Sequence, residues 1–178
     1  MLTIDRDRSA LLMIDFQQRL MPAIEDGAAA VANARRLLQA AEMLGVPILF
    51  TEHNAGGLGP TVAELAGFAE GRLAHKITFD ACRMTRFLDR LEDRRDIVVA
   101  GCEAHVCVLQ TALGLLDAGR RLYLVRDAVA SRRSESKETA VSRLARHGAE
   151  IVTTEMVVFE WLGSAEHPRF RDIIALIK

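Results

Sequence analysis

Short apolar runs alternate with longer segments of helical periodicity along nearly the whole chain, and this alternation constrains the fold more than any other feature. Five runs are typical of buried strands: residues 10–14, 47–51, 97–100, 122–125 and 150–152. Apolar residues recur at helical spacing in residues 28–44, 83–91, 107–118 and 134–147. Gly45, Gly119 and Gly148 mark helix ends. The alternation predicts a mostly parallel sheet whose right-handed crossovers place helices on both faces.

The composition limits the domain count and the classes of partner. A chain of 178 residues can form a single domain, residues 1–178, that buries most of its apolar surface. Half of the residues are hydrophobic and the formal net charge is −1, so we expect binding to neither nucleic acid nor an acidic membrane surface. No apolar run could span a bilayer, and the charged residues 5–8 are unlike a signal peptide, which together predict a cytoplasmic protein.

The three cysteines, Cys82, Cys102 and Cys107, match neither a disulfide framework nor a zinc-binding pattern. We therefore expect reduced thiols. Cys107 follows the run 97–100 after a turn and is predicted to open a helix, where unpaired N–H groups and the helix dipole favour a thiolate. The alternative is that its small side chain only packs the helix onto the sheet.

Asp15 is a second reactive residue at the carboxyl end of a predicted strand, directly after the run 10–14. Ligands of parallel α/β proteins bind at this edge of the sheet, so Asp15 and Cys107 are expected to share one site. The irregular segment 52–76 is too long for a simple turn and is predicted to border that site.

Three local sequences together resemble the isochorismatase-like cysteine hydrolase superfamily. They are Asp15 after Leu-Leu-Met-Ile, Lys76 in His-Lys-Ile-Thr-Phe, and Cys107 in Gly-Cys-Glu-Ala-His-Val-Cys-Val. The resemblance covers almost the whole chain and, through Thr51, Glu52 and the stretch Gly-Leu-Gly-Pro-Thr-Val at 57–62, is nearest to the isochorismatase domain-containing proteins. It implies a single-domain, doubly wound (Rossmann-like) α/β fold, with a mostly parallel six-stranded sheet flanked by helices on both faces.

The resemblance also implies a catalytic triad of Asp15, Lys76 and Cys107. Asp15 would take the thiol proton and return it to a leaving amine, while Lys76 would lower the pKa of the thiol. The backbone N–H groups of Glu103 and Cys107 would form the oxyanion hole, beside a cis peptide between Cys102 and Glu103. Taken singly, Asp15 could instead cap a helix and Lys76 could be a solvated loop charge.

Relatives with nicotinamidase activity hold a metal through an aspartate and histidines after the second strand. Residues 51–56 contain only one histidine, His53, and the adjacent Glu52 would point to the opposite face of an extended segment, so neither a metal nor another cofactor is expected. Phe16, His53 and His105 are candidate pocket residues, although His105 could face solvent. Phe79 is expected to pack in the core.

These features predict a metal-independent hydrolase that cleaves an amide-like or ureide-like C–N bond of a small molecule through a thioester on Cys107. Two other classes stay open: a catalytically silent binding protein that retains the fold, and a redox sensor with a Cys102–Cys107 disulfide. An activated Cys107 would react with iodoacetamide near neutral pH much faster than the other two thiols. Apolar residues late in the chain favour a homo-oligomer, a dimer or larger, with Trp161 in the core or at an interface.

Overall fold

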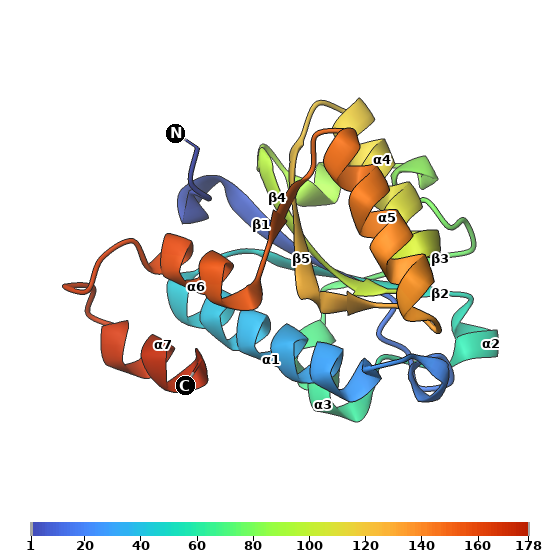
Figure 1. Ribbon diagram of the computed structural model, residues 1–178, viewed down its shortest axis with the longest axis horizontal. Helices are drawn as coiled ribbons and strands as arrows, with labels where there is room; N and C mark the ends of the chain where they lie inside the picture. The colour runs from blue at the N-terminus through green and yellow to red at the C-terminus, as the bar shows by residue number, and fades with distance from the viewer. Residues whose placement is uncertain (1, 178) are drawn as a thin grey trace.

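Six parallel strands form the centre of the computed structural model, which describes residues 2–177 (Figure 1). Their order across the sheet is β3-β2-β1-β4-β5-β6, and every neighbouring pair is parallel. The strands are β1 (Ser9–Ile14), β2 (Ile48–His53), β3 (Leu73–Lys76), β4 (Asp96–Cys102), β5 (Arg121–Ala130) and β6 (Glu150–Val152). This order confirms the predicted doubly wound, Rossmann-like α/β fold.

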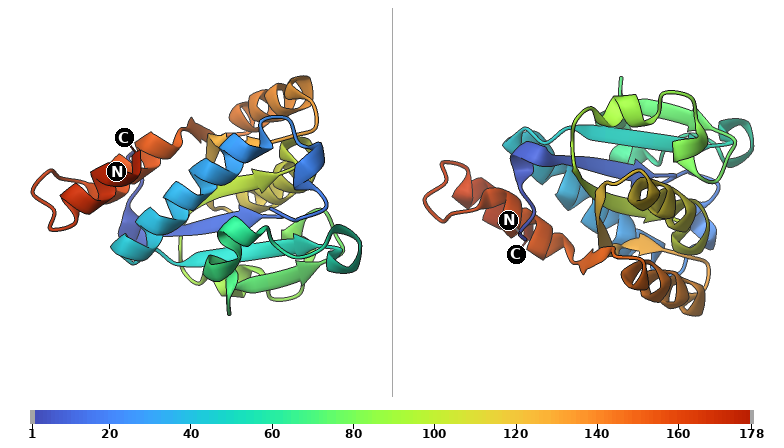
Figure 2. Two further views of the ribbon diagram at one scale, coloured as in Figure 1. Left: turned by 90° about the horizontal axis from the view of Figure 1, so that it is seen from below. Right: turned by 90° about the horizontal axis from the view of Figure 1, so that it is seen from above.

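Helices cover both faces of the sheet (Figures 1 and 2). One face carries α1 (Gly27–Leu44), α3 (Ala63–Ala69), α6 (Thr154–Leu162) and α7 (Phe170–Ile177), and the other carries α4 (Leu109–Asp117) and α5 (Ser134–Arg146). A short helix, α2 (Ala55–Leu58), follows β2. Within residues 2–177, no helix is long and apolar enough to cross a membrane.

The two core layers follow from the alternation of side chains along β1. Leu11 and Met13 pack under α1 and α6, whereas Leu12 and Ile14 pack under α4 and α5. Trp161 of α6 is 1% exposed, and its indole N–H donates to the hydroxyl of Ser9 at 3.2 Å, so Trp161 is a core residue. Burial on both faces explains why this strand is a continuous apolar run.

Two segments differ from the sequence-based expectation. Residues 83–91 form no α-helix: 3₁₀ turns occur at Ala81–Arg83 and Leu88–Leu91, and Arg86 between them has a left-handed φ of 61°. The segment 52–76, expected to be irregular, contains α2, α3 and β3. The edge strand β3 is half polar and pairs with one neighbour only, so it lacks the apolar run typical of the central strands.

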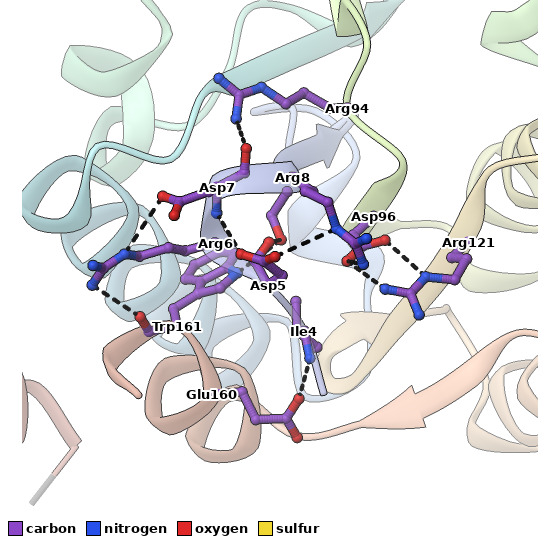
Figure 3. Close-up of polar contacts among 11 residues, drawn as sticks. Ile4, Asp5, Arg6, Asp7, Arg8, Arg94, Asp96, Arg121, Glu160 and Trp161 are labelled. Atoms are coloured by element: carbon purple, nitrogen blue, oxygen red, sulfur yellow. Dashed lines mark hydrogen bonds and ion pairs between the residues drawn. The ribbon is translucent and has the colours of Figure 1, made fainter. Parts of the chain in front are cut away.

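A charged network holds the amino ends of the strands (Figure 3). Asp96, at the start of β4, is fully buried and accepts hydrogen bonds from Arg121 at 2.7 and 2.8 Å, and Arg8 lies 3.6 Å from it. The backbone N–H of Ile4 donates to Glu160 of α6 at 2.6 Å. This network fastens the N-terminal segment to the edge of the sheet that lies opposite the candidate site.

Candidate active site

The candidate site lies where the strand order reverses. The chain leaves β1 for β2 and β3 on one side of the sheet and returns as β4 on the other side. Asp15 directly follows β1, and Cys107 follows β4 by five residues. Crevices at the carboxyl ends of strands, at such a switch point, are the usual ligand sites of open α/β sheets.

Lys76 reaches Asp15 from β3, with β2 in between. Neighbouring strands lie about 4.8 Å apart, so only a long side chain can cross a whole strand. The ammonium Nζ lies 2.7 Å from Oδ2 of Asp15. Oδ1 of Asp15 accepts a hydrogen bond from the hydroxyl of Thr51 on β2, with 2.6 Å between the oxygens. Asp15 is 1% exposed and Lys76 4% exposed. The alternatives of a helix-capping Asp15 and a solvated Lys76 are therefore wrong.

Backbone geometry beside Asp15 depends on Gly101. A Cβ atom at Gly101 would lie 2.3 Å from the carbonyl oxygen of Ile14, and Gly101 has a φ of 151°. Asp15 itself has a left-handed φ of 54°, and its N–H donates to the carbonyl of Thr51 at 3.1 Å. The glycine therefore allows β4 to approach β1 at the residue that precedes the carboxylate.

Cys107 lies inside a π-helical turn, Ala104–Val108, that precedes α4, and so it does not open the helix as expected. The turn follows a cis peptide between Cys102 and Glu103. Cys107 is 6% exposed, it lines the same cavity as Asp15, and the charges of Asp15 and Lys76 both act on the pKa of its thiol. The three elements β1, β3 and β4 thus bring together the carboxylate, the ammonium and the thiol that the sequence analysis singled out.

Burial, followed by the negative charge of Asp15, raises the pKa of the Cys107 thiol to about 12. The positive charge of Lys76 opposes both effects without overcoming them. The expectation of an acidic thiol is therefore wrong: the ground state is a neutral thiol beside a carboxylate that can accept its proton. Burial also raises the pKa values of Cys82 and Cys102 to about 12, and all three cysteines are free.

A cavity of 340 Å³ opens onto the thiol. Asp15, His53, Phe79, Glu103, Cys107 and Arg132 line it together with the apolar side chains of Leu20, Ala23, Leu58 and Val106. The ring of His53 lies 5.2 Å from that of Phe79, centroid to centroid. Burial, followed by the charge of Lys76, lowers the pKa of His53, so its imidazole is neutral at neutral pH.

Three pocket residues are placed differently from the sequence-based expectation. Phe79 is 48% exposed and lines the cavity, so the prediction of core packing is wrong. Phe16 is 1% exposed in the core beside α1 and does not line the cavity. His105 lines a neighbouring cavity, where its Nδ1 lies 3.0 Å from the hydroxyl of Ser131. Of the candidate pocket residues, only His53 lies in the wall beside Cys107.

Sequence reasoning missed Gln17, which holds the loop after β2 in place. Gln17 is fully buried; its amide N–H groups donate to the carbonyls of His53 at 3.0 Å and Gly59 at 2.7 Å, and its Oε1 accepts from the N–H of His53 at 2.8 Å. A glutamine two residues after a candidate catalytic carboxylate is a weak signal. Its role is visible only once the loop is folded.

Glu52 and His53 diverge, as the extended segment predicts. The carboxylate of Glu52 accepts from the N–H and the hydroxyl of Thr61 at 2.7 and 2.8 Å, and Nδ1 of His75 lies 3.4 Å from it. Among residues 2–177, no group of three or more His, Cys, Asp or Glu side chains is arranged to hold a metal ion.

Sequence reasoning also missed Arg132. The backbone N–H and the Nε of Arg132 both donate hydrogen bonds to the carboxylate of Glu103, each at 3.0 Å. This ion pair ties the turn before Cys107 to the loop after β5. Arg132 follows the carboxyl end of β5 by two residues, so the rule that singled out Asp15 could have found it.

The fold and the site define a doubly wound α/β protein with a buried Asp–Lys–Cys cluster at the switch point of its sheet. The family model described as the isochorismatase domain matches residues 9–156. The chain belongs to this isochorismatase-like hydrolase family, which confirms the resemblance inferred from the sequence.

Two relatives and one more distant neighbour illustrate the similarity. Isochorismatase domain-containing protein 2 of Danio rerio is 38% identical over 172 residues, covering 95% of this chain and 86% of the relative. A solved structure described as MAR1 ribonuclease from Caenorhabditis elegans is 33% identical with a TM-score of 0.94, covering 98% of this chain and 92% of that one. The YcaC gene product of Escherichia coli, described as an octameric hydrolase of unknown specificity, shares the fold at 22% identity and a TM-score of 0.88, covering 99% and 88%.

Proposed function

We propose that the protein is a metal-independent cysteine hydrolase that cleaves the C–N bond of a small amide or ureide through a thioester on Cys107. One observation carries the proposal: the buried carboxylate of Asp15 is bonded to the ammonium of Lys76 and the hydroxyl of Thr51, and it lines the same cavity as the thiol of Cys107. A carboxylate held between a cation and a thiol is suited to accept the thiol proton.

Acylation begins when a substrate carbonyl enters the cavity. Because the pKa of the thiol is raised, proton transfer from Sγ to Asp15 accompanies attack of sulfur on the carbonyl carbon. The backbone N–H groups of Glu103 and Cys107 are the proposed donors to the resulting oxyanion. Collapse of this tetrahedral intermediate breaks the C–N bond, and the proton held by Asp15 leaves with the amine. The ammonium of Lys76 keeps Asp15 in place throughout.

In deacylation, Asp15 again transfers a proton, this time from water to the sulfur of Cys107. Asp15 accepts a proton from a water molecule as the water oxygen attacks the thioester carbon. The second tetrahedral intermediate expels the sulfur, which recovers a proton from Asp15. The products are a carboxylic acid, or a carbamic acid from a ureide, and the free thiol.

The pattern of side-chain contacts favours this route over one through a metal. Glu52 is engaged by Thr61 and His75, whereas His53 packs on Phe79 in the cavity wall, so the two candidate ligands do not converge. The volume of 340 Å³ is near the lower end for small-molecule sites. This volume and the net charge of −1 favour a small substrate over RNA, although one relative is described as a ribonuclease.

Ammonia release across a panel of small amides and ureides tests the proposal. We expect release by the wild-type protein and by Cys82→Ser, a control at a half-buried thiol outside the cavity. Cys107→Ala should release none. Equal release by Cys107→Ala would contradict the proposal, as would RNA cleavage that requires Cys107 in a protein inactive on every amide.

We further propose that the chain forms a cytoplasmic homo-oligomer. Four large apolar side chains are 43–76% exposed: Ile77 and Phe79, which follow β3, and Met156 and Phe159 on α6. The fold neighbour described as an octameric hydrolase supports assembly of this kind, and three free thiols suit a reducing compartment. Light scattering coupled to size-exclusion chromatography should give a mass of at least two chains; a monomer would contradict this proposal.

A further inference from the structure

A second cavity, of 380 Å³, adjoins the catalytic one. His105, Arg132, Arg133 and Ser136 line it. Arg132 belongs to the walls of both cavities, so this one residue borders the space beside Cys107 as well as the second cavity. The second cavity therefore adjoins the proposed site of bond cleavage.

The lining of the second cavity has two guanidinium groups and no carboxylate. Of the three guanidinium nitrogens of Arg132, only Nε donates to Glu103. Among residues 2–177, its two Nη groups have no protein partner. The exposed side chain of Arg133 makes no hydrogen bond or ion pair within the part of the chain that the structure describes. Both arginines thus keep N–H donors directed to no protein acceptor.

The acids of the catalytic cavity do not cancel this positive charge. Asp15 is paired with Lys76 at 2.7 Å, and Glu103 is paired with Arg132 at 3.0 Å. Among residues 2–177, no acidic side chain is paired with Arg133. An anionic group that enters beside Arg132 therefore meets the free Nη donors of Arg132 and the positive charge of Arg133, both on exposed side chains where added salt weakens the attraction.

We propose that the second cavity is a subsite for a carboxylate carried by the substrate, and that Arg132 and Arg133 determine specificity for it. This inference rests on the proposed hydrolase function and narrows its substrate class to amides or ureides that also bear an acid group. A guanidinium presents parallel N–H donors whose spacing matches the two oxygens of a carboxylate. Phosphate shares this oxyanion chemistry and serves as a competitor in the test.

Alkylation of Cys107 tests the subsite without requiring turnover. Iodoacetate and iodoacetamide differ by a carboxylate in place of an amide, and site-resolved mass spectrometry measures the rate of each at Cys107. In Arg133→Gln we expect the ratio of the iodoacetate rate to the iodoacetamide rate to fall about three- to tenfold, and in Arg132→Gln about tenfold or more. Arg126→Gln is the control, because Arg126 is an exposed arginine paired with Glu138 and lines neither cavity.

The outcomes separate the subsite from the hydrolase. An unchanged rate ratio in both variants would overturn the subsite, whatever the enzyme hydrolyses. Inorganic phosphate should slow alkylation of Cys107 by iodoacetate more than alkylation by iodoacetamide. Equal slowing of both reactions would mean that a free anion blocks the entrance, and this result would also overturn the subsite. Among substrates, succinamate should exceed succinamide in kcat/KM, and the preference should shrink in Arg133→Gln by about the same three- to tenfold factor as the alkylation ratio. Hydrolysis of both without preference would overturn the subsite and leave the hydrolase standing.

Discussion

The buried pair of Lys76 and Asp15 allows a quantitative prediction for the variant Lys76→Met. Methionine has a similar length and no charge, so the substitution leaves the Asp15 carboxylate in a site that is 1% exposed without its cation. At 2.7 Å and an effective dielectric constant of about 20, the attraction that is lost is about 6 kcal/mol. Part of this is offset because the ammonium no longer has to be desolvated. Removal of one partner of a buried pair typically costs about 3–5 kcal/mol.

Urea unfolding measures this cost. With an m value of about 2–3 kcal/mol/M, Lys76→Met should lower the denaturation midpoint by roughly 1–2 M. The matched control is Arg126→Met, which removes the cation from an ion pair whose side chains are 55% and 50% exposed. Exposed pairs contribute about 0–1 kcal/mol, so the control should shift the midpoint by less than about 0.5 M.

A second substitution isolates the cause. Asp15→Asn in the Lys76→Met background removes the unpaired charge, so the double variant should be more stable than Lys76→Met alone. If Lys76→Met destabilises the protein no more than Arg126→Met does, the carboxylate is not held as a buried charge by Lys76. The reasoning about the site would then be refuted.

Three further predictions concern the thiol, the glycine beside the site and the opposite edge of the sheet. Because the pKa of Cys107 is raised to about 12, its alkylation by iodoacetamide should accelerate about 100-fold from pH 7 to pH 9; a plateau below pH 8 would contradict this. Gly101→Ala should lower the free energy of unfolding in urea by at least about 2 kcal/mol, because its Cβ would lie 2.3 Å from the Ile14 carbonyl oxygen. The control Gly56→Ala, where a Cβ would meet open space, should lower it by less than about 0.5 kcal/mol. Asp96→Asn should cost about 2–4 kcal/mol and leave kcat/KM for ammonia release within about threefold, because Asp96 lies at the opposite edge; a tenfold loss would argue against that separation.

The fold was predictable from the sequence where burial of a strand requires a recognisable pattern of apolar residues. Central strands such as β1 and β4 are buried on both faces, so they read as continuous apolar runs. The edge strand β3 has no such run and was missed. Helical spacing alone predicted a helix at 83–91, but local spacing does not reveal the left-handed conformation of Arg86 that separates two 3₁₀ turns.

The candidate site was predictable in part, for a physical reason. Asp15 and Cys107 follow strands, and the carboxyl ends of parallel strands share an edge, so pattern alone could bring them together. Lys76 acts across β2, a contact that no local spacing encodes, and only the family resemblance pointed to it. The thiol pKa was mispredicted because its sign depends on burial and on the competing charges of Asp15 and Lys76, which are properties of the folded site.

Detection of an acyl group on Cys107 tests the central claim most directly. The wild-type protein is mixed with the amide that releases ammonia fastest, quenched in acid within the first turnovers, and digested for mass spectrometry. We predict that the peptide containing Cys107 gains the mass of the acyl group, and that Cys107→Ser shows no such thioester. Ammonia release that proceeds at full rate in Cys107→Ser, or an acyl group found only on another residue, would contradict the account.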